Sequence, residues 1–207
     1  MAGADEPRPG SHPAVTGIPE SAFFQRPVTA VAPELLGMVL ACGDRAGRIV
    51  EVEAYGGADD PASHGHRGRT SRNEVMFGPP GRLYVYFTYG MHWCANVVCE
   101  PDGHCGAALI RALAPLRGVE DMWADRPKAR RERDLCSGPA KLTAALGIAG
   151  DHNGLDLLAP TSPVTIHQRY SSPPDLASSG RIGISAAGER PWRWYVPGDP
   201  NVSRPPR

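Results

Sequence analysis

The chain has 207 residues, of which 41% are hydrophobic and 21% charged, and its 22 basic and 22 acidic residues give a formal net charge of zero. This length and composition indicate one soluble globular domain with a substantial core, and the neutral balance argues against a protein that binds polyanions through charge alone. No apolar run approaches the roughly 20 residues that a membrane-spanning helix requires, so we expect a cytoplasmic protein with no membrane contact.

The cysteines form an odd set of five without Cys-x-x-Cys spacing, and we expect no secretory signal peptide. Free, mostly buried thiols in a reducing cytoplasm are therefore expected. No disulfide framework is predicted.

The N-terminal residues 1–19 are rich in Pro and Gly and predict a flexible tail before one domain over 20–203. Residues 20–38 predict a helix with Pro33 in its first turn. Residues 39–42 and 48–55 then predict a β-hairpin around a turn at 43–47.

Strand 48–55 alternates with period two, which predicts two distinct faces. Val50, Val52 and Ala54 are expected in the core. The opposite face carries Ile49, Glu51, Glu53 and Tyr55, so it places carboxylates beside an aromatic ring at the strand end.

A loop over 56–71 follows, and long loops in compact domains are usually functional or disordered. Arg67, Arg69 and Arg72 make it locally basic. It either contacts phosphates or is an ordinary solvated surface loop.

Residues 82–89, 92–99 and 105–113 predict three strands of an antiparallel meander. In the first strand Leu83, Val85 and Phe87 alternate with Tyr84, Tyr86 and Thr88. Arg111 lies inside an apolar strand, which is costly without a partner. A carboxylate partner is therefore expected, and Glu53 is one candidate.

The rest of the chain predicts a helix at 117–126, a basic linker at 126–134 and a helix ending at 146. Ser137 is the expected N-cap of the last helix, with Pro139 in its first turn and Gly147 after its end. Such a helix start suits a phosphate, although the motif alone is common. Strands are expected at 164–167, 181–185 and 192–196, and the end at 204–207 is expected to fray.

His64-x-His66, with two aspartates nearby, fits no zinc-ligand spacing. The chain has no phosphate-binding Walker motif and no dinucleotide fingerprint. We therefore expect no metal and no cofactor. What remains is Glu53 among tyrosines, which is either a stacking pocket or ordinary strand packing.

The motifs resemble a known family, the alkyladenine (3-methyladenine) DNA glycosylases. The matching blocks, in chain order, are L-L-G-M (35–38), V-E-V-E-A-Y (50–55), His64, R-N-E-V-M-F (72–77), G-R-L-Y-V-Y-F-T-Y-G-M-H (81–92), Asn96, L-I-R-A-L-A-P (109–115), L-C-S-G-P-A-K-L (135–142), R-I-G-I (181–184) and W-R-W-Y-V (192–196). They extend over nearly the whole chain.

The resemblance implies a role for each matched position. Glu53 would be the general base, with Arg111 and the carbonyl of Ile182 holding the attacking water. The base pocket would consist of Tyr55, His64, Tyr86, Asn96 and Leu109. Tyr89 and Met91 would intercalate in DNA. Ser137, Gly138, Lys141 and Arg72 would meet the DNA backbone.

The resemblance also implies the fold and the reaction. The fold would be α+β, a single domain with a curved, mainly antiparallel sheet flanked by helices. The protein would be a monomer that flips damaged purines out of double-stranded DNA, nucleoid-associated if bacterial, and hydrolyses the N-glycosidic bond. With lysine only at 128 and 141, a Schiff-base lyase step is not expected. The alternative is a non-catalytic damaged-DNA-binding module. His92 departs from relatives that carry an aromatic residue there.

Overall fold

The computed structural model describes residues 17–169 and 171–203. The expected flexible segment over 1–19 and the frayed end over 204–207 therefore lie almost wholly outside the described residues. Within the described part, no helix is long and apolar enough to cross a membrane.

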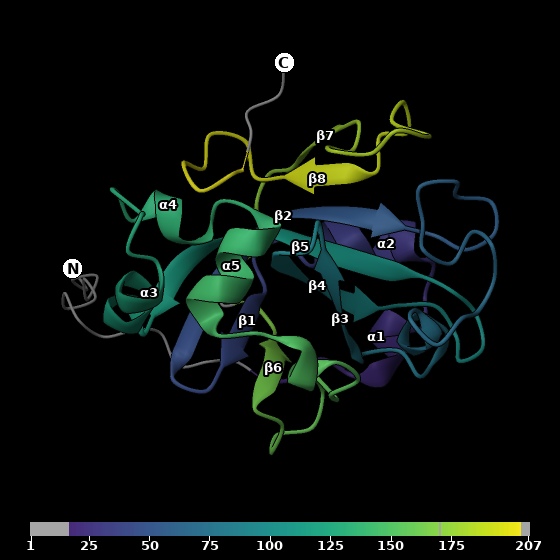
Figure 1. Ribbon diagram of the computed structural model, residues 1–207, viewed down its shortest axis with the longest axis horizontal. Helices are drawn as coiled ribbons and strands as arrows, with labels where there is room; N and C mark the ends of the chain where they lie inside the picture. Colours follow the sequence, from purple (N-terminus) through teal and green to yellow (C-terminus); the bar gives the residue numbers. More distant parts are fainter. Residues whose placement is uncertain (1–16, 170, 204–207) are drawn as a thin grey trace, which may run out of the picture.

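One curved sheet organises the fold (Figure 1). Its strands lie in the order β3 (Leu83–Thr88), β4 (His92–Val98), β5 (Ala107–Arg117), β2 (Arg45–Tyr55), β1 (Val39–Cys42) and β6 (Val164–His167). A short pair, β7 (Ala177–Ser179) and β8 (Arg193–Tyr195), joins the sheet through β2. All pairings between these strands are antiparallel, so the predicted meander and hairpin are confirmed.

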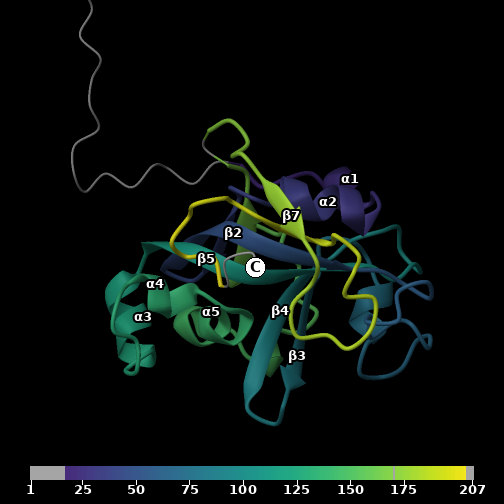
Figure 2. The same ribbon diagram turned by 90° about the horizontal axis from the view of Figure 1, so that it is seen from above.

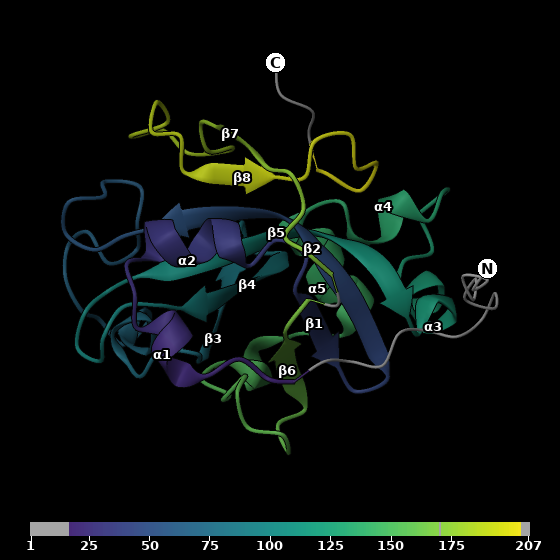
Figure 3. The same ribbon diagram turned by 180° about the vertical axis from the view of Figure 1, so that it is seen from behind.

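Helices cover both faces of the sheet (Figures 1 and 3). One side carries α3 (Val119–Asp125), α4 (Arg133–Cys136) and α5 (Pro139–Leu146), and the other carries α1 (Ser21–Phe24) and α2 (Val28–Glu34). Two short 3₁₀ helices, η1 (Glu74–Phe77) and η2 (Gly150–His152), interrupt the loops. This is the single-domain α+β architecture that was expected.

The main core lies between the sheet and the helices. Leu35 and Leu36, which follow α2, and Leu142 and Leu146 from α5 are at most 2% exposed and belong to one apolar cluster with strand residues such as Ile110. Each such side chain contributes about 1.5–3 kcal/mol through burial. The sheet is therefore held rigidly from both sides.

In the middle of strand β2, the alternation of inward-facing and outward-facing side chains is interrupted. Its pairing with β5 runs Ile49↔Leu113, Glu51↔Ala112 and Val52↔Ile110, so an extra residue on β2 is followed at once by an extra residue on β5. These paired β-bulges place Val50 and Glu51 of β2 in succession away from the main core. The predicted alternation is therefore wrong on the N-terminal side, because Ile49 packs with Val52 and Ala54 while Val50 packs with Ala112 and Ala114.

The bulges occur where β2 exchanges one neighbour for another. Its N-terminal part pairs with β1 as far as Arg48, and its C-terminal part pairs with β8 from Glu51 to Glu53. Because of the bulges, one strand forms the hairpin with β1 through its N-terminal part and carries Glu53 beside β8 in its C-terminal part. The hairpin turn itself is shorter than expected, with Gly43 and Asp44 joining Cys42 to Arg45.

Two helix predictions are wrong in detail. Pro33 lies near the end of α2 rather than in its first turn, because the helix already begins after Pro27. The N-cap of α5 is Gly138, not Ser137, and no side chain caps the helix. Pro139 in the first turn and left-handed Gly147 after the end are confirmed.

The strand expected at 181–185 is also wrong, since this segment forms bends. Gly183 adopts a left-handed φ of 78°, which breaks an extended conformation. The N–H of Ile182 donates to the Glu53 carboxylate instead of to a neighbouring strand. The segment is therefore shaped by the site that it covers.

Candidate active site

A cavity of about 350 Å³ opens beside the C-terminal half of β2. Its lining comes from β2, β3, β4, β5, the turn between β3 and β4, the 56–71 loop, η1, the start of α5 and the 181–184 segment. The lining residues are Tyr55, Ala62, His64, Met76, Tyr84, Tyr86, Thr88, Tyr89, His92, Cys94, Asn96, Leu109, Arg111, Pro139, Ala140, Ile182, Gly183 and Ile184. All five residues expected in a base pocket belong to this set.

Glu53 lies directly behind the cavity wall and has no solvent exposure. Its Oε2 accepts hydrogen bonds from the Tyr55 hydroxyl (2.9 Å) and Arg111 Nη1 (3.1 Å), and its Oε1 accepts from the Ile182 N–H (2.7 Å). All three partners line the cavity. A carboxylate has about four acceptor positions, so Oε1 retains one for a further donor.

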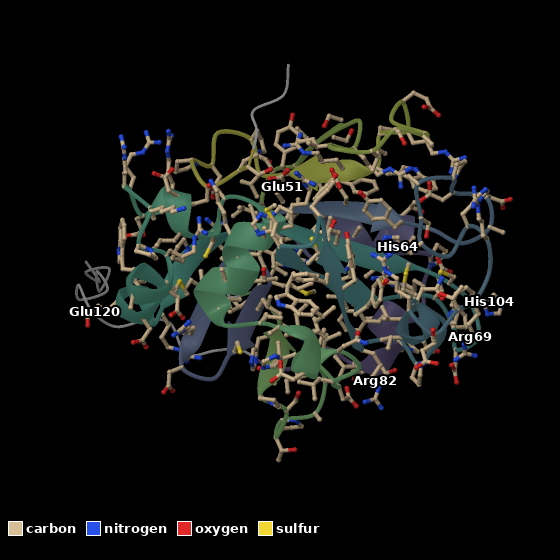
Figure 4. The ribbon with its side chains drawn as sticks, viewed as in Figure 1. Glu51, His64, Arg69, Arg82, His104 and Glu120 are labelled. Atoms are coloured by element: carbon tan, nitrogen blue, oxygen red, sulfur yellow. The ribbon has the colours of Figure 1, made fainter. Side chains whose placement is uncertain are left out.

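The predicted pairing of Arg111 with Glu53 is confirmed, but Glu51 is a second partner. Arg111 Nε donates to Glu51 at 2.9 Å, and Glu51 also accepts from Arg193 Nε (2.7 Å) and from the Ser203 N–H (2.6 Å). Glu51 is as fully buried as Glu53. Figure 4 shows Glu51 close to β8, which supplies Arg193.

The pKa values of Glu51 and Glu53 shift in opposite directions. Burial raises the pKa of Glu53 above its ordinary value, although Arg111 and the Ile182 N–H act in the opposite direction. Burial also opposes the charge of Glu51, but Arg111, Arg193 and Ser203 outweigh it and lower its pKa. Glu53 is therefore the carboxylate that more readily accepts a proton.

Aromatic rings form one wall of the cavity. His64 and Tyr86 meet edge to face with centroids 4.5 Å apart, and Tyr84 lies 5.5 Å from Tyr86. The Nδ1 of His64 and the Tyr84 hydroxyl are hydrogen-bonded at 2.9 Å. Burial, with a smaller contribution from Arg72, lowers the pKa of His64 and favours its neutral form. Such a wall suits a flat apolar ligand.

Tyr84 is not among the residues that the family resemblance assigns to the base pocket, but it belongs to the tyrosines around Glu53 and alternates with Tyr86 and Thr88 on one strand face. The loop that carries His64 is held by Asn73, whose Nδ2 donates to the carbonyls of His64 (2.7 Å) and Gly68 (3.0 Å). His64 therefore has a fixed position although it lies in a loop.

Asn96 and Leu109 are cross-strand partners on β4 and β5. Asn96 Nδ2 donates to the carbonyl of Tyr84 at 3.0 Å, and both side chains are at most 3% exposed. The amide is thereby fixed in orientation. Asn96 and Leu109 therefore form a rigid part of the cavity lining, in which the Asn96 amide is the polar group.

The β3–β4 hairpin projects from the sheet (Figure 2). Thr88, Tyr89 and His92 at its end line the cavity. Tyr89 is 81% exposed and Met91 66% exposed at its tip. Tyr89 and Gly90 have φ of 51° and 65°, and the Met91 N–H bonds to the Thr88 carbonyl, as in a type I′ turn. A positive φ at a bulky residue is strained, so the turn holds an apolar ring in solvent at an energetic cost.

The residues that are expected to contact the DNA backbone lie at the edge of the cavity and near the hairpin. Pro139 and Ala140 bring the start of α5 to the cavity edge, and Lys141 Nζ donates to Ser137 Oγ at 3.3 Å. Arg72 is exposed and reaches the carbonyl of Phe87 at 3.3 Å, near the hairpin tip. Figure 4 shows Arg69, a further cation of the same loop, on the outer rim of the molecule.

A buried ion pair between Arg181 and Asp60 was not anticipated. The guanidinium donates to both carboxylate oxygens at 2.6 and 2.7 Å and to the carbonyl of Ala54 at 3.0 Å. It also lies 4.8 Å from the ring centroid of Tyr55. The pair therefore joins three segments of the site, namely the end of β2, the loop after it and the 181–184 segment.

Comparison with known proteins agrees with this geometry. Residues 22–200 match the family model for methylpurine-DNA glycosylase (MPG). A Burkholderia lata protein named "Putative 3-methyladenine DNA glycosylase" is 59% identical over 89% of this chain and 90% of its own length. Proteins with the same name from Burkholderia cenocepacia and Rhodopseudomonas palustris are 58% and 54% identical, each over 88% of this chain and 89% of their own length.

The class of protein defined by this fold, cavity and match is a DNA glycosylase, a hydrolase of N-glycosyl bonds that acts in base-excision repair of alkylated DNA. The chain belongs to the methylpurine-DNA glycosylase family. The resemblance seen in its sequence motifs is confirmed. The family match supports a catalytic enzyme rather than a non-catalytic damaged-DNA-binding module.

Proposed function

We propose that the enzyme removes 3-methyladenine, 7-methylguanine, hypoxanthine and ethenoadenine from double-stranded DNA and leaves an abasic site. The observation that carries this proposal is that all three hydrogen-bond partners of buried Glu53 line the cavity. A base inside a duplex cannot be reached, so the damaged nucleotide is flipped into the cavity at a cost of a few kcal/mol.

Glu53 is the general base in this mechanism. The remaining acceptor position of its carboxylate takes the proton of a water, which then attacks the C1′ atom of the sugar as the N-glycosidic bond breaks. The positive charge that develops on the sugar is stabilised by the same carboxylate. Arg111 and the backbone of Ile182 hold the carboxylate and the water in place.

The aromatic wall supplies binding energy for the flipped base. Stacking on an aromatic ring is worth about 1–3 kcal/mol per base, and Tyr55, His64 and Tyr86 provide three such surfaces. Purines that carry a positive charge after alkylation gain further attraction to the ring faces. Asn96 and Leu109 limit the space beside the base, so they crowd the exocyclic amine of undamaged guanine. In 7-methylguanine, which carries the same amine, the added positive charge strengthens the attraction to the rings and offsets this crowding.

The exposed hairpin fills the space that the flipped base leaves in the duplex. Tyr89 intercalates, with Met91 beside it, and the backbone is held by Ser137, Gly138, Lys141 and Arg72. The enzyme acts as a monomer in this proposal. No metal or cofactor takes part.

The test is the substitution Glu53→Gln, which keeps the shape of the side chain and removes its basicity. Base release from duplexes containing ethenoadenine or 3-methyladenine should fall below detection, while binding to the same duplexes persists. Excision at the wild-type rate by this variant would overturn the assignment of Glu53. A panel of lesion duplexes measured with the wild-type enzyme would define the substrate range.

A further inference from the structure

Ser203, which lies 150 residues after Glu53 in the chain, meets the charged groups behind the cavity. Its N–H donates to Glu51 Oε2 at 2.6 Å, and its hydroxyl donates to Glu51 Oε1 at 2.8 Å. The same hydroxyl accepts from Arg111 Nη2 at 3.4 Å. One serine thus contacts both the carboxylate and the guanidinium that flank the proposed base.

The orientation of Arg111 depends on these contacts. Its planar guanidinium presents Nε to Glu51, Nη1 to Glu53 and Nη2 to Ser203. A guanidinium has a fixed fork of donors, so holding Nε and Nη2 determines where Nη1 points. The contact with Glu53 is therefore set by groups on the far side of Arg111.

We propose that Ser203 is a positioning residue for the excision reaction, acting through Glu51 and Arg111 to fix the Glu53 carboxylate at the cavity wall. This rests on the proposed function of Glu53 as general base. Neither Ser203 nor Glu51 lines the cavity, so neither is expected to touch the flipped base. Their contribution is to the geometry and charge of the reacting carboxylate.

The segment that carries Ser203 is anchored independently of the serine hydroxyl. Arg48 Nη2 donates to Asp199 at 2.8 Å, and Val202 packs against the small apolar cluster that contains Val50. The Ser203 N–H contact with Glu51 is also unaffected by the side chain. Ser203→Ala therefore removes the hydroxyl contacts without releasing the segment.

Single-turnover excision of ethenoadenine by Ser203→Ala should be slower by about three- to tenfold, as expected for loss of one hydrogen-bonding group. Affinity for the damaged duplex should be unchanged. The acid limb of the pH–rate profile should move to higher pH, because a loosened Arg111 stabilises ionised Glu53 less. The charged or titratable groups that interact with Glu53, and so influence this profile, are Arg111, Glu51, Tyr55, Arg181 and Cys94.

Ser179→Ala is the matched control, because Ser179 Oγ accepts from Arg193 Nη1 at 2.9 Å. It removes a serine hydroxyl from the other guanidinium on Glu51 but leaves Arg111 and its contacts intact. We expect its rate and pH profile to match wild type. Ser203→Thr, which keeps a hydroxyl, should restore the rate.

An unchanged rate and pH profile in Ser203→Ala would overturn the proposal. Equal slowing of both alanine variants, in proportion to lost thermal stability and without a pH shift, would also overturn it, since Ser203 would then be merely structural. Glu53→Gln is measured in parallel. Excision by that variant would instead overturn the proposed base, so the two failures are distinguishable.

Discussion

Glu51 and Glu53 lie two residues apart on β2 and are equally buried, yet their pKa values move in opposite directions. A carboxyl group whose pKa is raised on folding destabilises the folded state when it is ionised, whereas one with a lowered pKa stabilises it. The ionised form of Glu53 is thus maintained at a cost to stability, as is common at functional sites.

Glutamine substitutions at these two positions should therefore affect stability with opposite signs. At pH 7, Glu53→Gln should raise the melting temperature, because burial makes the ionised Glu53 carboxylate unfavourable in the folded state. Glu51→Gln should lower stability by about 3 kcal/mol, because it removes the buried negative charge that Arg111 and Arg193 share. Thermal scans of both variants check this, and a loss of stability in Glu53→Gln would contradict it.

The activity of the wild-type enzyme should fall on the acid side at a pH above the ordinary Glu pKa of 4.5. Ionised Glu53 is the active form in the proposed mechanism, and its folded pKa is raised, so activity is present above that pKa and lost as pH falls through it. A single-turnover pH–rate profile measures the midpoint. A midpoint below 4.5 would argue against Glu53 as the titrating base.

Single residues were predicted well where the sequence carried a chemical conflict. Arg111 inside an apolar strand required a carboxylate, and the structure supplies Glu53. Glu51 was placed on the same strand face as Glu53, but its contacts with Arg193 and Ser203 were not predicted, because these residues are more than 140 positions away. No periodicity in a sequence reports a contact of that range.

At the scale of elements, the β3–β4 hairpin combines two exposed apolar side chains with a strained turn. Tyr89→Ala should weaken binding to a lesion-containing duplex much more than binding to a free damaged base, because the ring fills a gap that only the duplex has. Fluorescence titration with both ligands measures this. Met91→Ala provides the comparison at the same tip, and equal losses for duplex and free base in Tyr89→Ala would remove the intercalating role.

The 181–184 segment depends on the pair between Arg181 and Asp60. Burial opposes the charge of Asp60, but Arg181 and the N–H groups of Gly56 and Ala62 outweigh it and lower its pKa. The stabilisation is thus fully present above the ordinary pKa of 3.8 and lost as pH falls through the lower folded value.

Asp60→Asn should therefore cost about 3 kcal/mol at pH 7, because Arg181 is left buried without its partner. The difference from wild type should shrink as the pH falls below about 4. Urea unfolding at pH 7 and pH 3 measures both values. A difference that is the same at both pH values would exclude the ion pair as its source.

Elements were predictable where side-chain periodicity was uninterrupted, as in β3, β4 and β6. The 181–185 segment also alternates, but its backbone N–H groups serve the site and Gly183 turns the chain. Ser137 resembles an N-cap, yet the helix starts one residue later. In both cases tertiary contacts outweighed the local pattern, and these contacts are not encoded within the segment.

At the scale of the whole molecule, all five thiols are free, as expected from their spacing. Burial raises the pKa of Cys105 to about 11 and of Cys136 to about 12, and that of Cys42, Cys94 and Cys99 as well. Because the thiolate is the reactive form, a pKa of 11 leaves about one thiol in a thousand ionised at pH 8.

The native enzyme should therefore react slowly with a thiol-specific disulfide reagent at pH 8, and all five cysteines should react at once after unfolding in urea. Absorbance of the released thiolate follows both reactions. A rapid first phase in the native protein would identify a thiol whose pKa is not raised. Cys42 and Cys105, the two partly exposed thiols, are the positions to replace in that case.

The paired bulges of β2 and β5 form a local defect in an otherwise regular sheet. Val52 lies three positions after Ile49, and Ile110 lies three positions before Leu113, so hydrogen-bond register is preserved while the inward-facing set shifts by one. Deleting Val50 alone would remove the bulge on β2 and leave the bulge on β5 without its counterpart, so the two strands would no longer advance by equal lengths between Ile49 and Val52. Chimaeras with family relatives should thus tolerate junctions on either side of this defect but not within residues 49–52.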